Sequence, residues 1–273
     1  MVTRAEWVSW RGLRVLVAGG TGFIGRAVAR ELAQRGAEVT VVARGREEPE
    51  VAGRSVVGKL MRGDLRDADT ALAACAGQQA VFLLAALDGN GAFKRAHAAE
   101  VVRSNSLIAL NVLESAVATS VERLVLVSSS EVYAPLKGDG LLSEVIPLGS
   151  IEGLNPYAVS KVFSEVAALQ YVRQFSLNVA VARPANVYGP GDELVGERAR
   201  VIPRWICEAE GGRPLELWGG GGGNAVVHIR RRSRRGAPAL GRKRPGGPTG
   251  EFGARGGGDI AGAGRGNSGG GRV

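Results

Sequence analysis

The sequence R-V-L-V-A-G-G-T-G-F-I-G, residues 14–25, decides the fold of this chain. Its first five residues form an apolar run typical of a buried strand, and the apolar spacing of residues 25–35 predicts a helix. Between them, Gly19, Gly22 and Gly25 allow a tight turn in which the backbone approaches a bound group closely. Because the amide groups that begin a helix attract phosphate, the stretch predicts a dinucleotide-binding turn.

Further along the chain, short apolar runs alternate with longer stretches of helical periodicity. These patterns predict strands at residues 14–18, 38–43, 80–86, 124–128 and 178–182, and helices at 25–35, 100–119 and 157–175. Strands and helices in alternation build a parallel sheet with helices on its faces. We therefore expect an α/β fold, a Rossmann-like doubly wound parallel sheet, over residues 12–218.

The composition changes abruptly after Trp218. Residues 1–218 carry 24 basic and 24 acidic side chains, so the whole net charge of +9 belongs to residues 219–273. Glycine is concentrated in the same tail, and Phe252 is its single aromatic residue. With so little apolar surface to bury, the tail cannot offset the entropy cost of ordering its backbone. We expect this Gly/Arg-rich tail to be disordered.

Cysteine and histidine are too sparse to build a metal site or a disulfide framework. The two cysteines, Cys75 and Cys207, are far apart in sequence, and the two histidines are isolated. The amino terminus lacks the apolar core of a signal peptide, and the longest apolar run, residues 80–87, is too short to span a membrane. We expect a cytoplasmic protein with no metal ion and no membrane partner.

The end of the second predicted strand bears on which dinucleotide binds. An acidic residue about 20 residues beyond the glycines would accept a hydrogen bond from the ribose 2′-hydroxyl of NAD. Here Ala43 occupies that place, followed by Arg44 and Arg46. Because a guanidinium pairs with a 2′-phosphate, the sequence favours NADP over NAD, the alternative being that these arginines are merely exposed to solvent.

Candidate acid–base residues follow two later elements. Tyr157 and Lys161 stand four residues apart at the start of a predicted helix, so both side chains lie on one face. A tyrosine that acts as a base near neutral pH needs its pKa lowered by roughly three units, about 4 kcal/mol, and a neighbouring ammonium favours that change. Residues 128–130, three serines, end a central strand at the edge where such sheets bind ligands, and a serine there could hydrogen-bond the substrate oxygen.

Taken together, these motifs resemble the extended short-chain dehydrogenase/reductase family of NAD-dependent epimerases and dehydratases. The motifs are G-G-T-G-F-I-G (19–25), G-D-L-R-D (63–67), S-S-S-E-V-Y (128–133), Y-A-V-S-K (157–161) and R-P-A-N-V-Y-G-P (183–190). The resemblance implies that Tyr157 is the acid–base residue, that Lys161 holds the nicotinamide ribose and lowers the tyrosine pKa, and that Ser129 polarises the substrate oxygen. The family's 4,6-dehydratases carry Thr-Asp-Glu before Val-Tyr, whereas here Ser129-Ser130-Glu131 lacks the aspartate.

The resemblance also implies cofactor and substrate contacts at the matching positions, with Asp64 at the adenine and Asn186 near the phosphates of the nucleotide sugar. The expected cofactor-binding residues are Gly19, Thr21, Gly22, Phe23, Ile24, Gly25, Arg44, Asp64, Leu65, Ala85, Ala86, Tyr157, Lys161 and Pro184. The expected substrate-binding residues are Ser130, Glu131 and Asn186.

Three functions are compatible with these residues. We favour an NAD(P)-dependent nucleotide-sugar epimerase or dehydratase-type oxidoreductase with a Ser-Tyr-Lys acid–base set and, as a further expectation, a homodimer. The motifs end near Trp218, so the C-terminal substrate lobe is expected to be mostly missing and activity to be impaired; we interpret this as a change of reading frame near Gly219–Asn224. The alternatives are a non-catalytic, dinucleotide-binding or redox-sensing protein, and a basic RNA-binding protein that uses its tail. Nucleic acid is the less favoured partner, because such tails usually interleave aromatic residues.

Overall fold

The computed structural model describes residues 9–44, 58–133, 153–196, 199–215 and 227–229. A six-stranded sheet forms its centre, in the order β3-β2-β1-β4-β5-β6, and every pair of neighbouring strands is parallel. The strands are β1 (Arg14–Ala18), β2 (Glu38–Ala43), β3 (Lys59–Arg62), β4 (Ala80–Leu83), β5 (Arg123–Val127) and β6 (Val179–Ala182). The α/β fold with a doubly wound parallel sheet is thus confirmed.

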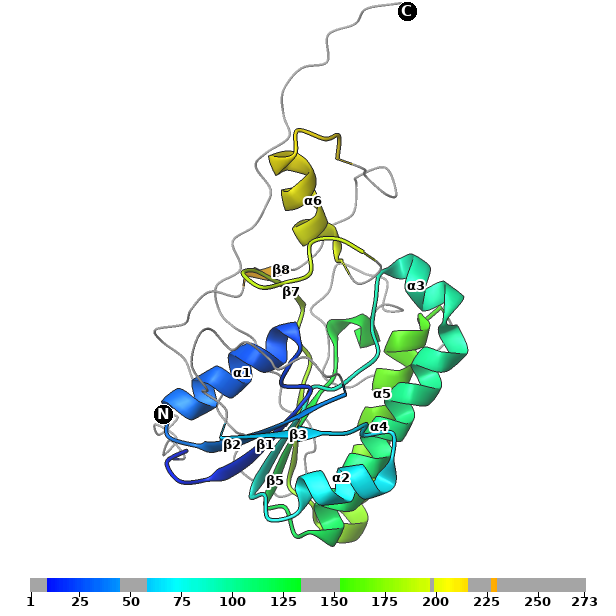
Figure 1. The fold of residues 1–273 in the computed structure, drawn as a ribbon. Helices are drawn as coiled ribbons and strands as arrows, with labels where there is room; N and C mark the ends of the chain where they lie inside the picture. The colour runs from blue at the N-terminus through cyan, green and yellow to red at the C-terminus, as the bar shows by residue number, and fades with distance from the viewer. Residues whose placement is uncertain (1–8, 45–57, 134–152, 197–198, 216–226, 230–273) are drawn as a thin grey trace, which may run out of the picture.

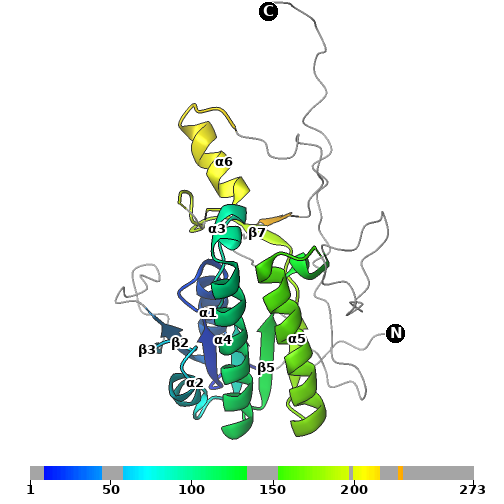
Figure 2. The ribbon, with the colours of Figure 1, turned by 90° about the vertical axis from the view of Figure 1, so that its right-hand side faces the viewer.

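Helices connect the strands and cover both faces of the sheet. They are α1 (Phe23–Gln34), α2 (Ala68–Cys75), α3 (Gly91–Ala96), α4 (Ala98–Ala118) and α5 (Pro156–Phe175), with a 3₁₀ turn, η1 (Ser130–Tyr133). Figure 1 shows α1 on one face and α2, α4 and α5 on the other. In Figure 2, α4 and α5 stand side by side along the second face, and the two helices make extensive contact.

The core is divided by the sheet into two apolar layers. Val15, Leu16, Val17 and Ala18 of β1 are completely buried because helices cover both faces of this strand. Leu16 and Ala18 belong to the layer beneath α2, α4 and α5, whereas Val15 and Val17 pack with apolar residues of α1 and β2. This division follows from the alternation of side chains along a strand.

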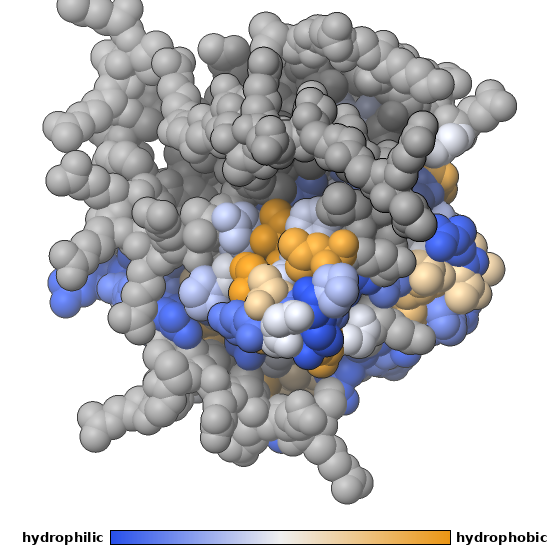
Figure 3. All heavy atoms as spheres, turned by 90° about the horizontal axis from the view of Figure 1, so that it is seen from above, coloured by the Kyte–Doolittle hydropathy of each residue, from blue (hydrophilic) through white to orange (hydrophobic). Residues whose placement is uncertain are grey.

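A smaller group of elements lies beyond the carboxyl ends of the sheet strands. It contains β7 (Asn186–Tyr188), α6 (Val201–Glu210) and β8 (Val227–Ile229), and β7 and β8 form a parallel pair. Figure 1 places this group above the sheet, and Figure 2 shows it at the same end of the molecule. In Figure 3, which looks down on this end, hydrophobic residues stand among hydrophilic ones; Val201 and Ile206 of α6 are among the exposed large apolar residues.

The structure differs from the sequence-based expectation in several elements. The strand expected over residues 80–86 ends at Leu83, and β3, α2, α3 and α6 were not predicted. Residues 227–229 form β8 inside the tail that was expected to be disordered, so that expectation is wrong for these three residues. Residues 230–273, Gly219–Asn224 and Arg46 lie outside the described part of the chain. Among the residues described, no helix has both the length and the apolar character needed to cross a membrane.

Candidate functional site

The glycine turn between β1 and α1 is packed too tightly for larger residues at several positions, among them Gly19 and Gly25. Gly19 has a φ of +84°, and a Cβ atom there would lie 2.7 Å from the backbone nitrogen of Ala85. A Cβ atom on Gly25 would collide with the carbonyl oxygen of Gly19 and would lie 2.8 Å from the Cα atom of Gly20. The glycines therefore bring the first turn of α1 directly against the ends of β1 and β4.

The amino end of α1 suits a bound phosphate group. Gly22 is the N-cap residue, and within the described chain no side chain makes a capping hydrogen bond there. The first turn of α1 also carries no acidic residue that would repel an anion. Backbone amides and the positive end of the helix dipole are thus left to face a ligand, as in pyrophosphate sites of this fold class. The residues present fit the pyrophosphate of a dinucleotide.

The ends of β2 and β3 place opposite charges at the same edge of the sheet. Arg44 is exposed directly after Ala43, and the backbone amide of Gly63 donates to the carbonyl oxygen of Ala43 over 3.0 Å. Asp64 accepts hydrogen bonds from the backbone and side chain of Arg66, the shortest being 2.6 Å from the guanidinium. Arg66 is the main cause that lowers the pKa of Asp64, and Arg44 adds a smaller effect in the same direction. The predicted adenine contact, Asp64, is therefore an ionised carboxylate already held by Arg66.

Other predicted cofactor contacts lie along the same edge. Ala85 and Ala86 follow β4 and are half-buried, with the backbone of Ala85 against Gly19. Leu65 is buried, and its carbonyl oxygen accepts a hydrogen bond from the Asn111 amide at 3.0 Å. The carbonyl oxygen of Pro184 accepts from the backbone amide of Ser130 at 3.0 Å.

The three serines follow β5, and Ser130 begins η1. Ser129 is buried, and its hydroxyl accepts a hydrogen bond from the backbone amide of Glu131 at 3.1 Å. Ser128 is also buried, and within the described chain its hydroxyl has no hydrogen-bond partner. A buried hydroxyl without a partner is costly, so this carboxyl edge retains polar capacity that a ligand could satisfy.

Tyr157 and Lys161 lie together at the start of α5. Asn155 caps this helix by accepting hydrogen bonds from the backbone amides of Tyr157 and Ala158, which fixes where the helix begins. The Lys161 Nζ atom lies 5.4 Å from the centre of the Tyr157 ring and donates to the carbonyl oxygen of Val127 at 2.8 Å. The predicted tyrosine–lysine pair is thus brought together, and Val127 at the end of β5 orients the ammonium.

Burial shifts both groups of this pair toward their neutral forms. It lowers the pKa of Lys161 to about 8, against smaller opposing effects of Asp88 and Glu165. Burial also raises the pKa of Tyr157 far above its usual value; the charges of Asp88 and Glu131 add to this, and Arg200 opposes it. In the absence of ligand, Tyr157 therefore keeps its proton at neutral pH.

Glu131, predicted to bind substrate, has a carboxylate that is already engaged by two side chains. The Lys94 Nζ atom donates to both of its oxygens, at 2.8 and 3.0 Å, and the Asn155 amide donates at 2.6 Å. Because Asn155 also caps α5, these contacts connect η1 to the helix that carries Tyr157. Lys94 was not predicted, because a single lysine in the short helix α3 has no spacing relation to the other motifs.

The group of β7, β8 and α6 beyond the sheet contributes another cationic side chain near the glycine turn, that of Arg200. Arg200, at the N-cap of α6, lies with its guanidinium carbon 5.3 Å from the centre of the Phe23 ring and forms an ion pair of 3.1 Å with Asp192. Asn186, the predicted substrate-binding residue of this segment, is exposed at the start of β7. The segment from β7 to α6 thus reaches the start of α1, where the glycine turn ends.

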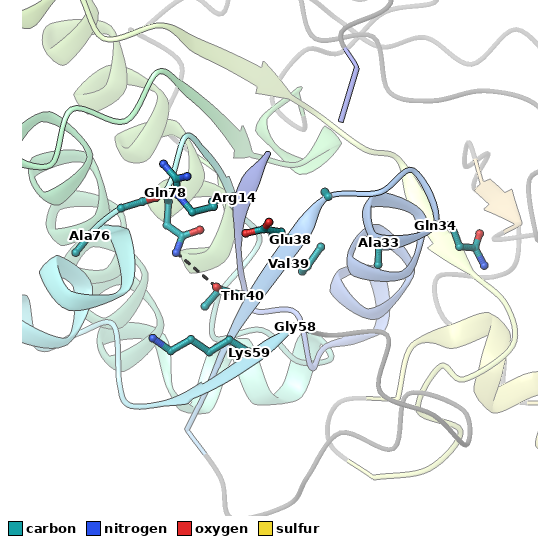
Figure 4. A pocket seen from close by; sticks show the side chains of 12 residues that line it. Arg14, Ala33, Gln34, Glu38, Val39, Thr40, Gly58, Lys59, Ala76 and Gln78 are labelled. Carbon is teal, nitrogen blue, oxygen red and sulfur yellow. Dashed lines mark hydrogen bonds between the residues drawn. The ribbon is translucent and has the colours of Figure 1, made fainter. Parts of the chain in front are cut away.

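A hollow lies at the edge of the sheet opposite to these predicted site residues. This hollow of about 980 Å³ is lined by residues at the amino ends of strands, among them Arg14, Glu38 and Lys59 (Figure 4). Figure 4 also shows the hydrogen bond of 3.4 Å between the Gln78 amide and the Thr40 hydroxyl. Its lining contains none of the predicted site residues, so the hollow is separate from the carboxyl-edge site.

Comparison with known proteins gives consistent similarities. The sequence model of the NAD dependent epimerase/dehydratase family matches residues 15–227, which extends beyond Trp218. A dTDP-4-dehydro-6-deoxy-D-allose reductase from Streptomyces sp is 36% identical over 229 residues, covering 81% of this chain and 70% of the reductase. GDP-L-fucose synthase from Escherichia coli K12 is 27% identical over 214 residues, covering 76% of this chain and 63% of the synthase.

Similarity also extends to solved structures. A dTDP-glucose 4,6-dehydratase from Streptomyces venezuelae, crystallised as a double mutant with NAD bound, superposes with a TM-score of 0.70 at 28% identity. The match covers 80% of this chain and 68% of the dehydratase. A second structure, WbmF from Bordetella bronchiseptica in complex with NAD+, gives a TM-score of 0.67 at 26% identity, covering 81% of this chain and 67% of that protein.

Proposed function

Since the chain belongs to the NAD-dependent epimerase/dehydratase family, we propose that it reduces a ketone on a nucleotide-linked sugar with Tyr157 as the proton donor. One observation carries this proposal: Tyr157 and Lys161 lie together, 5.4 Å from ring centre to ammonium, at the carboxyl edge of the sheet. The glycine turn opens at the same edge, and ligands of open α/β sheets bind there.

The cofactor is assigned to the glycine turn and the neighbouring strand ends. A nicotinamide bound there would supply the hydride that reduces the substrate carbon. Gly22 at the N-cap allows the pyrophosphate to approach the start of α1, and Gly19 and Gly25 hold that turn against the strand ends. Asp64, after the end of β3, is proposed to face the adenine. Arg44, exposed at the end of β2 where the position before it lacks an acid, supports a preference for NADP.

The protonation state of Tyr157 suits a reduction. Because burial raises its pKa, Tyr157 is a phenol at neutral pH and holds a proton that a developing alkoxide on the substrate can accept. The resulting phenolate would be stabilised by the ammonium of Lys161, which the carbonyl of Val127 holds in place. Ser129 is proposed to donate a hydrogen bond to the same substrate oxygen and thereby polarise the ketone.

Reduction, rather than dehydration, is favoured by Glu131 and by the relative at 36% identity. A dehydration needs an acid to protonate the departing hydroxyl, whereas the carboxylate of Glu131 already accepts hydrogen bonds from Lys94 and Asn155. The relative at 36% identity is named as a reductase of a dTDP-linked dehydro sugar. We therefore place the substrate in the class of nucleoside-diphosphate 4-dehydro-6-deoxyhexoses.

The test is the oxidation of NADPH, followed at 340 nm, with a dTDP-linked 4-dehydro-6-deoxyhexose as substrate. Tyr157→Phe should lower kcat at least a hundredfold, because a positioned general acid contributes about 10²–10⁴-fold. Tyr171→Phe is the matched control, since Tyr171 lies later on α5 with its ring 5.6 Å from Phe175, and it should leave kcat unchanged. If the parent chain binds NADPH and never oxidises it, the chain is a dinucleotide-binding protein without turnover and the proposal is wrong.

A further inference from the structure

A second ammonium group approaches the Tyr157 ring from another element. Lys94 lies on α3, and its Nζ atom is 4.7 Å from the centre of that ring, closer than the Nζ atom of Lys161 at 5.4 Å. The Lys94 side chain is only 12% exposed, so its charge is removed from most of the screening by solvent. A cation over the face of an aromatic ring at this distance interacts with it favourably.

The same ammonium is shared by two carboxylates. Lys94 Nζ lies 3.2 Å from Asp88 Oδ1, in the segment before α3, and 2.8 Å from Glu131 Oε1 on η1. Both carboxylates act on Tyr157 by making loss of its proton harder. Lys94 thus contacts both acidic groups that oppose the formation of a Tyr157 phenolate.

The charged groups that act on Tyr157 or lie over its ring come from several parts of the fold. Asp88 precedes α3, Lys94 lies on α3, Glu131 on η1, Lys161 on α5 and Arg200 at the N-cap of α6. If Lys94 were absent, the negative charges of Asp88 and Glu131 would be balanced, among these groups, only by Lys161 and Arg200. The balance of charge at the phenol therefore depends on a residue from outside the Tyr-x-x-x-Lys motif.

We propose that Lys94 is a positioning residue of the proton-transfer step: its ammonium offsets part of the negative charge of Asp88 and Glu131 and thereby lowers the free energy of the Tyr157 phenolate that forms when the proton is donated. The O–H bond of Tyr157 breaks as the substrate oxygen gains the proton, and in the reverse direction the phenolate takes it back. This inference rests on the proposed role of Tyr157 as the acid–base residue. Lys94 itself transfers no proton and is not required to touch the substrate.

α3 has other supports that should preserve the fold when Lys94 is replaced. Asn90 caps the helix by accepting from the backbone amide of Phe93 at 2.9 Å, and the Phe93 and His97 rings stack 4.5 Å apart. Lys94→Met keeps most of the length of the side chain and removes its charge. Lys94→Arg keeps the charge and serves as the conservative variant.

The first experiment needs no turnover. The full chain, labelled with ¹³C at the tyrosine Cζ atom, is titrated without cofactor, and Tyr157→Phe identifies the Tyr157 signal. We expect the phenolate fraction at a given alkaline pH to fall about tenfold in Lys94→Met, equivalent to one pKa unit, and to stay near the parent value in Lys94→Arg. An unchanged titration in Lys94→Met overturns the proposal.

The second experiment separates charge from packing. In a Lys94→Met/Glu131→Gln double variant, removal of one uncompensated carboxylate should restore part of the lost phenolate fraction, which a purely structural role of Lys94 would not allow. Glu131→Gln alone should raise the phenolate fraction of Tyr157 above that of the parent. This single variant keeps the test decisive even if Lys94→Met fails to fold. No restoration in the double variant, or no rise in the single variant, overturns the proposal.

A pH profile then connects the effect to catalysis. With NADPH and the sugar substrate, Lys94→Met should shift the pH dependence of kcat toward higher pH and change KM much less. If no chain turns over substrate, the proposed function fails while the tyrosine titration still decides the role of Lys94. If the parent turns over substrate and the Lys94→Met profile coincides with it, the inference about Lys94 fails alone.

Discussion

Gly25→Ala should damage both the stability of the fold and cofactor binding, because the added methyl group has no space. Its Cβ atom would collide with the carbonyl oxygen of Gly19 and would stand 2.8 Å from two further backbone atoms, on Gly19 and Gly20. Backbone atoms cannot move aside as the end of a flexible side chain can. The first turn of α1 must therefore shift relative to β1.

The size of the effect follows from the nature of the contact. Forcing an extra carbon into a well-packed region costs about 1–3 kcal/mol, and we expect this loss in the free energy of unfolding of Gly25→Ala. The same shift displaces the amides at the start of α1 from the pyrophosphate, so the Kd for NADPH should rise at least tenfold, or about 1.4 kcal/mol. Denaturant unfolding and calorimetric titration with NADPH measure the two quantities.

Gly22→Ala is the matched control for stability. Gly22 has a φ of −74°, and the nearest atom to an added Cβ is the Gly19 carbonyl oxygen at 3.3 Å, a tight contact that a small shift relieves, unlike the collision at Gly25. Its free energy of unfolding should fall by less than that of Gly25→Ala. A Gly25→Ala chain that unfolds at the parent's denaturant midpoint and binds NADPH with the parent's Kd would refute the reasoning.

Three other substitutions test separate parts of the account. Arg44→Glu should weaken NADP binding by about 1.5–3 kcal/mol, because a charge-assisted hydrogen bond is lost, and it should affect NAD binding much less. If the parent binds NADP and NAD with equal affinity and the substitution changes neither value, this prediction is wrong. Glu165→Gln should lower the free energy of unfolding by about 3 kcal/mol, because the Arg183 guanidinium loses a carboxylate at 2.6 Å and its side chain is only 4% exposed. An unchanged denaturant midpoint would show that this ion pair does not stabilise the fold. Arg66→Met should return the lowered pKa of Asp64 toward 3.8, as measured by ¹³C NMR. A lowered pKa gives stability that is present above 3.8 and lost as the pH falls through the folded value, so the acid sensitivity that Asp64 contributes should decrease too; an unchanged Asp64 pKa would contradict this.

The central elements of the fold could be predicted because each carries its own local signal. β1 and β2 were predicted with their observed bounds, since both are apolar runs between polar or glycine boundaries. β3 was missed because K-L-M-R has charged ends and only two apolar residues, so that pairing with β2 rather than its own pattern makes it a strand. β8 was missed because a composition rule over a whole tail cannot detect a three-residue strand whose hydrogen bonds come from β7.

The residues of the candidate site could likewise be predicted only where the sequence carries a local signal. Tyr157 and Lys161 were found together because their spacing along one helix is visible in the sequence, and the glycine turn because a strand and a helix flank it. Lys94 could not be found, because α3 meets η1 and α5 only in the folded chain. The sequence also could not show that the Glu131 carboxylate is occupied by Lys94 and Asn155, since these contacts join three separate elements.

The most direct test of the central claim follows a deuterium atom from the cofactor into the sugar. NADPH labelled with deuterium on one face or the other of the nicotinamide C4 is incubated with the full chain and a dTDP-linked 4-dehydro-6-deoxyhexose, and the sugar product is examined by mass spectrometry. We expect a single deuterium in the product from one of the two labelled cofactors, and no labelled product with Tyr157→Phe in the same incubation time. A reduced sugar that contains deuterium from neither cofactor, or equal labelling by Tyr157→Phe, would contradict it.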